Sequence, residues 1–212
     1  MGLTDDDRAR SFQYQENRAR EAFASEATDL GAYLRGLDMR MVWSRFDSVS
    51  LQRVVQLINK TNQFNLTTRR HGEAEIRAVM DDPAAIGLQM RLLDRFGDNG
   101  IVAIVIGRLA GDVLDIDTWL MSCRVLGRQM EAATLSLLAS QAREIGAKQL
   151  IGHYVPTAKN GMVREHYATL GFHKVSEAAD GATVWRLELD GFLPEPTVIE
   201  TVGAPTRAGI PA

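Results

Sequence analysis

A short run near the middle of the chain combines a thiol, two arginines and a glycine at the start of a helical pattern. Cys123, Arg124, Gly127 and Arg128 follow an apolar strand-like segment and precede leucines and alanines that recur at helical spacing. A strand-to-helix turn leaves the first N–H groups of the helix unpaired, and the helix dipole adds to their attraction for anions. The run therefore predicts a phosphate- or pyrophosphate-binding loop, although a glycine between arginines also begins many ordinary helices.

Three side chains close to this loop are candidates for moving protons or forming a covalent bond. Asp115 and Asp117 share a strand face with Trp119 and are candidates for a general base, unless that face simply meets solvent. Cys123, the only cysteine of the chain, is a candidate nucleophile, because helix N-termini and neighbouring cations favour the thiolate that would hold an acyl group. A single cysteine also serves as a small apolar side chain.

Elements on either side of this region carry further polar candidates. The loop at 60–70 is rich in amide, hydroxyl and guanidinium groups, which either cap neighbouring backbone or bind a ligand. Downstream, residues 148–154 predict a strand, and residues 160–170 predict a helix that ends at Gly171. Tyr167 on that helix is either a proton donor or a tyrosine of the core.

The order of these elements resembles the acetyl-CoA-binding half of the GNAT superfamily of N-acetyltransferases. The pyrophosphate loop of that superfamily reads Q/R-x-x-G-x-G/A, which Arg124 and Gly127 match, whereas Gln129 stands where the second small residue belongs. A later helix of the superfamily carries an Asn and, seven residues on, a Tyr before Gly-Phe. Asn160 and Tyr167, followed by the Gly-Phe pair at 171–172, match that pattern.

This resemblance implies a site for a pantetheine thioester, carried by CoA or by an acyl carrier protein. The residues that it assigns to the pantetheine arm and the phosphates are Leu120, Met121, Ser122, Cys123, Arg124, Val125, Leu126, Gly127, Arg128, Gln129 and Asn160. It places the polar loop at the border of the acceptor pocket, so that binding is favoured there over capping. The substrate-binding residues expected from that loop are Asn62, Gln63, Asn65, Thr67, Arg69 and Arg70. We expect the two arginines to face an anionic partner.

A second resemblance rests on three longer motifs in order: NKTNQFNLTTRR at 59–70, DRFGDNG at 94–100 and MSCRVLGR at 121–128. They are similar to the C-terminal half of FkbH-like proteins, which serve polyketide and nonribosomal peptide assembly lines. Complete members begin with a haloacid-dehalogenase-like domain whose D-x-D-x-T motif does not precede these motifs here. The resemblance implies transfer of an acyl unit, possibly of glyceryl type, to or from an acyl carrier protein. The alternative is a non-catalytic docking module for the carrier protein.

Composition narrows the functional classes further. The formal net charge of −3 over 212 residues argues against a nucleic-acid binder. No apolar run reaches the length of a membrane span and the first residues do not form a signal peptide, so we expect a cytoplasmic protein. The four histidines share no ligand spacing, so no metal site is expected.

The expected fold is α/β, with helices around a mixed, mostly antiparallel sheet of about six or seven strands. The strands that end at Met121 and begin near Gln149 should be parallel and should splay apart to leave a cleft. Residues 1–36 predict a helical extension whose Phe12, Phe23 and Leu30 pack on the domain or on a second copy, which would make a homodimer. Residues 37–191 form the GNAT-like domain. Residues 192–212 hold four of the six prolines and predict a loose tail.

Overall fold

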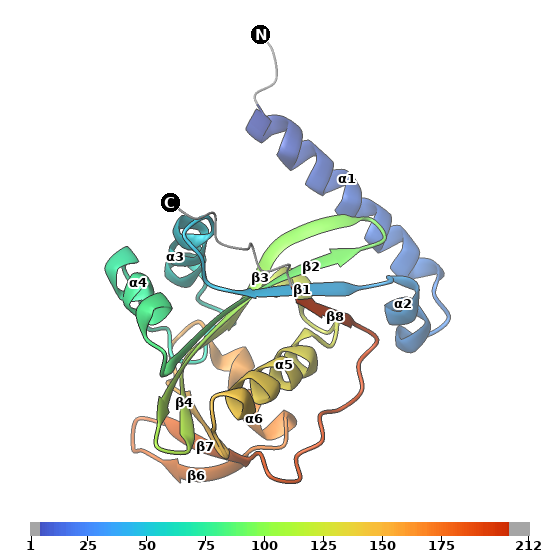
Figure 1. The fold of residues 1–212 in the computed structure, drawn as a ribbon. Coiled ribbons are helices and arrows are strands. Elements are labelled where there is room, and N and C mark those ends of the chain that lie inside the picture. The colour runs from blue at the N-terminus through green and yellow to red at the C-terminus, as the bar shows by residue number, and fades with distance from the viewer. Residues whose placement is uncertain (1–4, 204–212) are drawn as a thin grey trace.

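The computed structural model describes residues 5–203, which form a single eight-stranded sheet between helices (Figure 1). The strand order is β6-β7-β5-β4-β3-β2-β1-β8. The strands are β1 (Arg40–Arg45), β2 (Ala85–Asp94), β3 (Gly97–Ala110), β4 (Val113–Met121), β5 (Gln149–Tyr154), β6 (His173–Glu177), β7 (Thr183–Glu188) and β8 (Glu200–Gly203). Only β4–β5 and β1–β8 pair in parallel. The predicted mixed, mostly antiparallel sheet is confirmed, with eight strands in place of six or seven.

Helices cover both faces of the sheet. They are α1 (Asp5–Glu26), α2 (Leu30–Gly36), α3 (Leu51–Lys60), α4 (Glu73–Asp81), α5 (Met130–Glu144) and α6 (His166–Thr169), with short 3-10 turns at Cys123–Val125 and Gly161–Val163. α3 and α4 lie on one face and α5 and α6 on the other (Figure 1). The central strand β3 is an almost continuous aliphatic run because it is buried on both faces: Ile104 and Ile106 pack under α3 and α4, whereas Val105 packs on the opposite side.

β4 and β5 part half-way along their length, as the sequence predicts. Their parallel ladder runs from Val113 opposite Gln149 to Ile116 opposite Gly152 and ends there. At the same point the β3–β4 register shifts by one residue, which leaves Asp117 as an extra residue in β4. Such a bulge bends a strand and increases its twist, which accounts for the divergence.

A segment of the loop after α3 fills the gap that the two strands leave, and the sequence did not predict this. The Met121 N–H donates to the Phe64 carbonyl (3.0 Å), and the Leu66 N–H donates to the Trp119 carbonyl (3.1 Å). On the other side, the Val155 N–H beyond β5 donates to the Leu66 carbonyl (2.8 Å). Phe64–Leu66 therefore behaves as a short strand between β4 and the end of β5.

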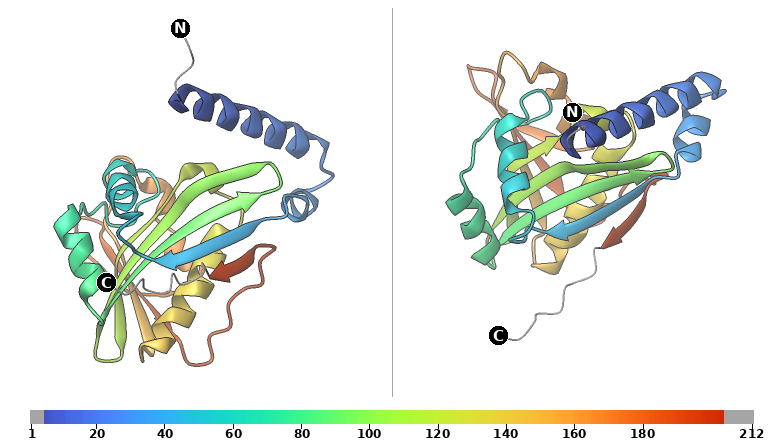
Figure 2. Two further views of the ribbon diagram at one scale, coloured as in Figure 1. Left: turned by 45° about the horizontal axis from the view of Figure 1, so that its top comes forward. Right: turned by 90° about the horizontal axis from the view of Figure 1, so that it is seen from above.

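The N-terminal helical pattern is divided into two helices. α1 ends at Glu26 and α2 begins at Leu30, where the Asp29 side chain accepts a hydrogen bond from the Ala32 N–H (2.7 Å). α1 runs past the tip of the β2–β3 hairpin (Figure 2), where the Phe23 ring packs 5.6 Å from the ring of Phe96. Leu30 is largely exposed, and the side chain of Phe12 lies outside the described residues.

The prediction of a loose tail from 192 does not account for Glu200–Gly203, which form a strand. The chain crosses to the far edge of the sheet, where β8 pairs in parallel with β1 from Arg40 opposite Glu200 to Trp43 opposite Gly203. The β-branched residues around Thr201 suit a strand, and the neighbouring prolines masked this signal in the sequence. The remaining residues of the tail lie outside the described part.

Candidate functional site

An open cleft of about 610 Å³ lies at the end of β4, between the polar loop and the loop after β5. It brings together residues predicted for substrate and for cofactor, because Asn62 and Gln63 face Ser122 and Cys123 across it. The lining residues are Leu57, Lys60, Thr61, Asn62, Gln63, Phe64, Met121, Ser122, Cys123, Ala158 and Lys159. We call this cavity the Cys123 cleft.

The thiol and the rim of the Cys123 cleft are accessible. Cys123 is exposed, at the first residue of the 3-10 turn that follows β4. Lys60 and Lys159 on the rim are also exposed, and neither forms an ion pair with any of the side chains that the structure describes, from 15 to 203. The rim is therefore cationic and suits an anionic partner.

The predicted phosphate loop forms the expected turn, and the Glu131 carboxylate of the protein lies near its Gly127 N–H. Gly127 and Gln129 have φ values of 72° and 65°, in the left-handed region where only glycine is unstrained. The Gln129 side chain turns away from the loop, since its Oε1 accepts from the Val198 N–H (2.9 Å). Burial raises the pKa of Glu131, and the nearby N–H groups of Gly127 and of Glu131 itself oppose this shift.

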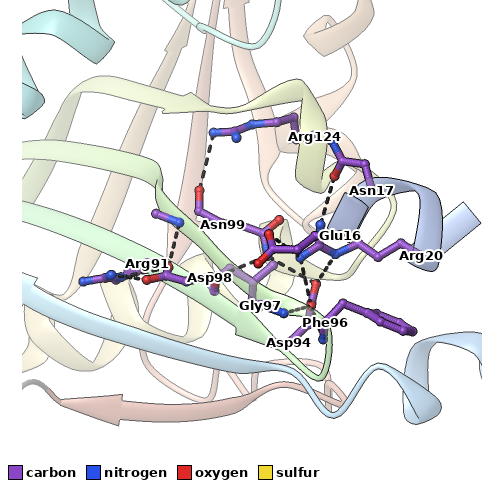
Figure 3. Close-up of polar contacts among 12 residues, drawn as sticks. Glu16, Asn17, Arg20, Arg91, Asp94, Phe96, Gly97, Asp98, Asn99 and Arg124 are labelled. Atoms are coloured by element: carbon purple, nitrogen blue, oxygen red, sulfur yellow. Dashed lines mark hydrogen bonds and ion pairs between the residues drawn. The ribbon is translucent and has the colours of Figure 1, made fainter. Parts of the chain in front are cut away.

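The two loop arginines are bound by other groups of the protein, although Arg124 is exposed. Arg128 donates to Asp94 Oδ2 (3.2 Å), a carboxylate that also binds Arg20 of α1 (Figure 3). Arg124 donates to the Ser122 hydroxyl (3.2 Å) and to the Asn99 carbonyl (3.4 Å), so its partners are neutral. Of the two loop cations, only Arg124 keeps its charge uncompensated.

A second polar cluster lies on the α3–α4 face of the sheet, around the bulge in β4. His71 Nε2 donates to Asp117 Oδ1 (3.1 Å), the Thr118 hydroxyl donates to the same oxygen (2.8 Å), and Arg69 pairs with the other carboxylate oxygen. Burial alone would raise the pKa of Asp117, but the hydrogen bonds from His71 and Thr118 and the charge of Arg69 lower it to about 2. A carboxylate this acidic is a poor general base at neutral pH.

The other predicted base, Asp115, belongs to a carboxylate–imidazole pair that the sequence did not reveal. Asp115 Oδ2 lies 2.9 Å from His153 Nε2, and both side chains are partly exposed. The hydrogen bond with Asp115 raises the pKa of His153 despite its partial burial. Ile151 lies opposite Asp115 in the parallel ladder, and His153 is two residues further along the same face. The pair could have been predicted only from this strand register, which the sequence alone does not give.

Tyr167 and Asn160 are both buried beneath the gap between β4 and β5. The Tyr167 ring packs so closely on the sheet that a Cβ on Gly152 would lie 2.3 Å from it. Burial raises the pKa of Tyr167, which stays protonated at neutral pH. The Asn160 amide donates to the Asn65 carbonyl (3.0 Å) and the Val155 carbonyl (2.9 Å), so in this structure it fastens the protein's own segment.

Most of the predicted substrate residues hold the polar loop in shape. The Asn65 side chain accepts from the Thr68 N–H (2.9 Å), and the Thr67 hydroxyl donates to the Asp117 carbonyl (2.9 Å). Arg70 pairs with the Asn62 side chain and the Ile58 carbonyl. Only Asn62 and Gln63 of the predicted set line the Cys123 cleft. Sequence alone did not separate the capping residues from the cleft residues.

The low pKa of Asp117 predicts how stability depends on acid. Its folded pKa of about 2 lies below the ordinary 3.8, so the unfolded chain binds the proton more tightly, and the stabilisation is present above pH 3.8 and lost as the pH falls toward 2. We expect a loss of about 2 kcal/mol from this group. Urea unfolding of the wild type and Asp117→Asn at several pH values isolates it, because the variant should show the shallower decline below pH 4. Parallel curves would contradict the assignment.

The described residues offer neither a membrane helix nor a metal cluster. No helix within residues 5–203 combines the length and apolarity needed to cross a bilayer. The same residues contain no group of three or more His, Cys, Asp or Glu side chains placed to hold an ion.

Comparison with known proteins gives relatives by fold alone. No protein-family model matches the sequence, and no curated protein matches it. The ribosomal-protein-S18-alanine N-acetyltransferase from Escherichia coli superposes with a TM-score of 0.52 at 14% identity, over 70% of this chain and 94% of that one. The GNAT domain of S. lividans PAT gives 0.54 at 16%, over 69% and 89%. Spermidine N-acetyltransferase from Vibrio cholerae, solved with CoA and spermine, gives 0.53 at 8%, over 71% and 96%. The chain has the GNAT fold.

Proposed function

We propose that this GNAT-fold protein is an acyltransferase whose donor is a thioester on a phosphopantetheine arm, presented by an acyl carrier protein. The observation that carries the proposal is the exposed Cys123 in an open cleft at the end of β4, beyond the point where β4 and β5 part. The cationic rim formed by Lys60 and Lys159 supports it, because carrier proteins present the arm from an acidic surface.

The loop after β4 supports a carrier protein over CoA as the donor. CoA brings a pyrophosphate, which would compete with the Glu131 carboxylate for the N–H group of Gly127. Arg128 would add little attraction, since Asp94 already neutralises it. The residues present therefore do not fit a pyrophosphate. A carrier-bound arm has a single phosphodiester, which would remain near the uncompensated charge of Arg124 at the edge of the cleft.

The chemistry that we propose is acyl exchange at the thiol. The Cys123 thiolate attacks the thioester carbonyl, the bond to the pantetheine sulfur breaks, and the released pantetheine thiolate takes up a proton. The acyl group is then a thioester on Cys123 and passes to the acceptor. The resemblance to FkbH-like proteins supports an acyl unit of glyceryl type and a role in polyketide or nonribosomal peptide biosynthesis.

A non-catalytic docking module is the second candidate, and one observation favours it. Phe64–Leu66 fills the gap between β4 and β5, and the Glu131 carboxylate lies near the Gly127 N–H, so that the protein would recognise the carrier protein through its rim alone. The two candidates differ in whether the arm reaches Cys123.

An alkylating donor tests this difference. A carrier protein loaded with bromoacetyl-pantetheine should alkylate Cys123, because the Cys123 Sγ displaces bromide. This reaction should be about tenfold faster than the reaction with bromoacetyl-CoA at equal concentration, since the cationic rim attracts the carrier protein and Glu131 disfavours the pyrophosphate of CoA. Intact-mass measurement gives an unambiguous answer since Cys123 is the only cysteine. Rates are normalised to iodoacetamide, which reports the intrinsic reactivity of the thiol.

Two variants serve as controls. Cys123→Ala should show no adduct, and Glu131→Gln should accelerate labelling by bromoacetyl-CoA while leaving the carrier-protein reaction unchanged. A carrier protein that binds but labels no faster than iodoacetamide would support the docking module. If the carrier protein and bromoacetyl-CoA label Cys123 at equal rates, the loop around Gly127 does not discriminate between the two donors.

A further inference from the structure

The strand-like segment Phe64–Leu66 is placed where an extended ligand with amide groups would pair. It uses the Met121 N–H and the Trp119 carbonyl, the backbone groups of β4 that point into the gap. On the far side it is held by the Val155 N–H. Where β4 and β5 part, each strand is left with an unpaired edge. The peptide groups of Phe64–Leu66 form hydrogen bonds with both of these edges.

Beneath this segment lies a cluster of aromatic side chains whose polar atoms have no partner. Within residues 5–203, five buried side-chain atoms lack a hydrogen bond, and three of them are Trp119 Nε1, His166 Nε2 and the Tyr167 hydroxyl. The ring of His166 lies 4.6 Å from that of Trp119 and 5.1 Å from that of Phe64. Leaving buried polar atoms unpaired costs free energy, so a state that provides partners for them is favoured.

We infer that Phe64–Leu66 is a displaceable plug, and that the donor arm binds along β4 by exchanging with it. The inference rests on the proposed function in taking a pantetheine arm as the ligand. The amide groups of the arm would take over the hydrogen bonds of Met121 and Trp119. The reacting end of the ligand would then lie against His166 and Tyr167 and supply their missing partners.

The contacts of the plug show how it moves. Asn65 at its centre is held by its own loop, since its side chain donates to the Thr61 carbonyl (3.2 Å) and accepts from the Thr68 N–H (2.9 Å). The only side-chain hydrogen bond that ties the plug backbone to the other side of the gap comes from Asn160. The plug therefore leaves the gap together with the loop residues that hold Asn65, which also breaks the hydrogen bond from the Thr67 hydroxyl to the Asp117 carbonyl, and the amides of Leu66 and Val155 are released together.

Amide hydrogen exchange measured by NMR tests this opening in the free protein. Leu66 and Val155 should share one protection factor, at least about 100-fold below that of Ser122, whose N–H bonds to Val102 within the sheet. Added 4′-phosphopantetheine should lower the protection of Leu66 and Val155 further and preserve that of Met121. If Leu66 and Val155 are as protected as Ser122 in the free protein, the plug does not open and the inference fails, whatever the ligand does.

A matched pair of variants links opening to binding. Phe64→Leu loosens the plug, whereas Phe46→Leu changes a buried phenylalanine of the other core cluster. Phe64→Leu should raise the open fraction and the affinity for 4′-phosphopantetheine by the same factor, about tenfold, and Phe46→Leu should change neither. If the wild type and both variants bind 4′-phosphopantetheine tightly and with equal affinity, the inference of a displaceable plug is overturned. If the plug opens but no protein binds 4′-phosphopantetheine, the inference of a displaceable plug stands. The pantetheine donor of the proposed function is then refuted.

Discussion

Replacing Asp94 with alanine should destabilise the protein by about 3–5 kcal/mol, because it leaves buried arginines without their counter-charge. The Asp94 carboxylate is fully buried and accepts hydrogen bonds from Arg20 at 2.7 and 3.0 Å and from Arg128 at 3.2 Å. It also accepts from the N–H groups of Phe96 and Gly97 (Figure 3). Urea unfolding followed by circular dichroism measures the loss.

The neighbouring Asp98 provides the control for this substitution. It pairs with Arg91 at the surface, where more than half of the Arg91 side chain is exposed. Exposed pairs contribute little, so Asp98→Ala should cost less than about 1 kcal/mol. If Asp94→Ala and Asp98→Ala lower the free energy of unfolding by similar amounts, burial is not the reason that the Asp94 ion pairs stabilise the protein.

Tyr167→Phe should separate stability from activity. The hydroxyl is buried without a partner among residues 5–203, so its removal should leave the free energy of unfolding unchanged or raise it by about 1–2 kcal/mol. Burial raises the pKa of Tyr167, so the hydroxyl still carries its proton at neutral pH, although it is a weaker acid toward a leaving thiolate than an exposed tyrosine. If Tyr167 donates that proton, acyl transfer should slow by about 100-fold.

Tyr154→Phe is the matched substitution, since Tyr154 is a buried tyrosine at the end of β5 in the same core. It should leave the transfer rate within about twofold of the wild type, because no proton transfer is assigned to it. The readouts are the melting temperature and the rate of acyl transfer from a loaded carrier protein. An unchanged rate in Tyr167→Phe would mean that this side chain only packs the core.

The sequence predicted the elements whose patterns are local. The turn at Gly127 and the helix stop at Gly171 each follow from spacing within a few residues, and both are present in the structure. The parallel and diverging course of β4 and β5 was also predicted, because a strand, a long helix and a second strand lead to a parallel pair.

Features that depend on contacts between distant residues were not predicted. Asp94 belongs to the DRFGDNG motif, in which nothing indicates that this carboxylate binds Arg20, 74 positions earlier. The expected obstacle in the phosphate loop was Gln129, whereas the structure turns that side chain toward Val198 and places Glu131 at the Gly127 N–H. Neither arrangement leaves a periodic signal, because each requires two parts of the chain to meet.

The pairing of β8 with β1 fixes an order for assembly of the sheet. Arg40 and Glu200, opposite each other in this pair, are separated by 160 positions along the chain. Of the strands that the structure describes, the one that borders β1 is therefore the last to be synthesised, and this edge of β1 stays unpaired on the ribosome until residue 203 has emerged. Bringing β1 and β8 together closes a long loop, and the entropic cost of this closure is offset only once the rest of the sheet has formed. We therefore expect this edge to form late in folding. The same stretch of chain supplies the Val198 N–H to Gln129, so the turn before α5 obtains its final support only when the last strand has docked.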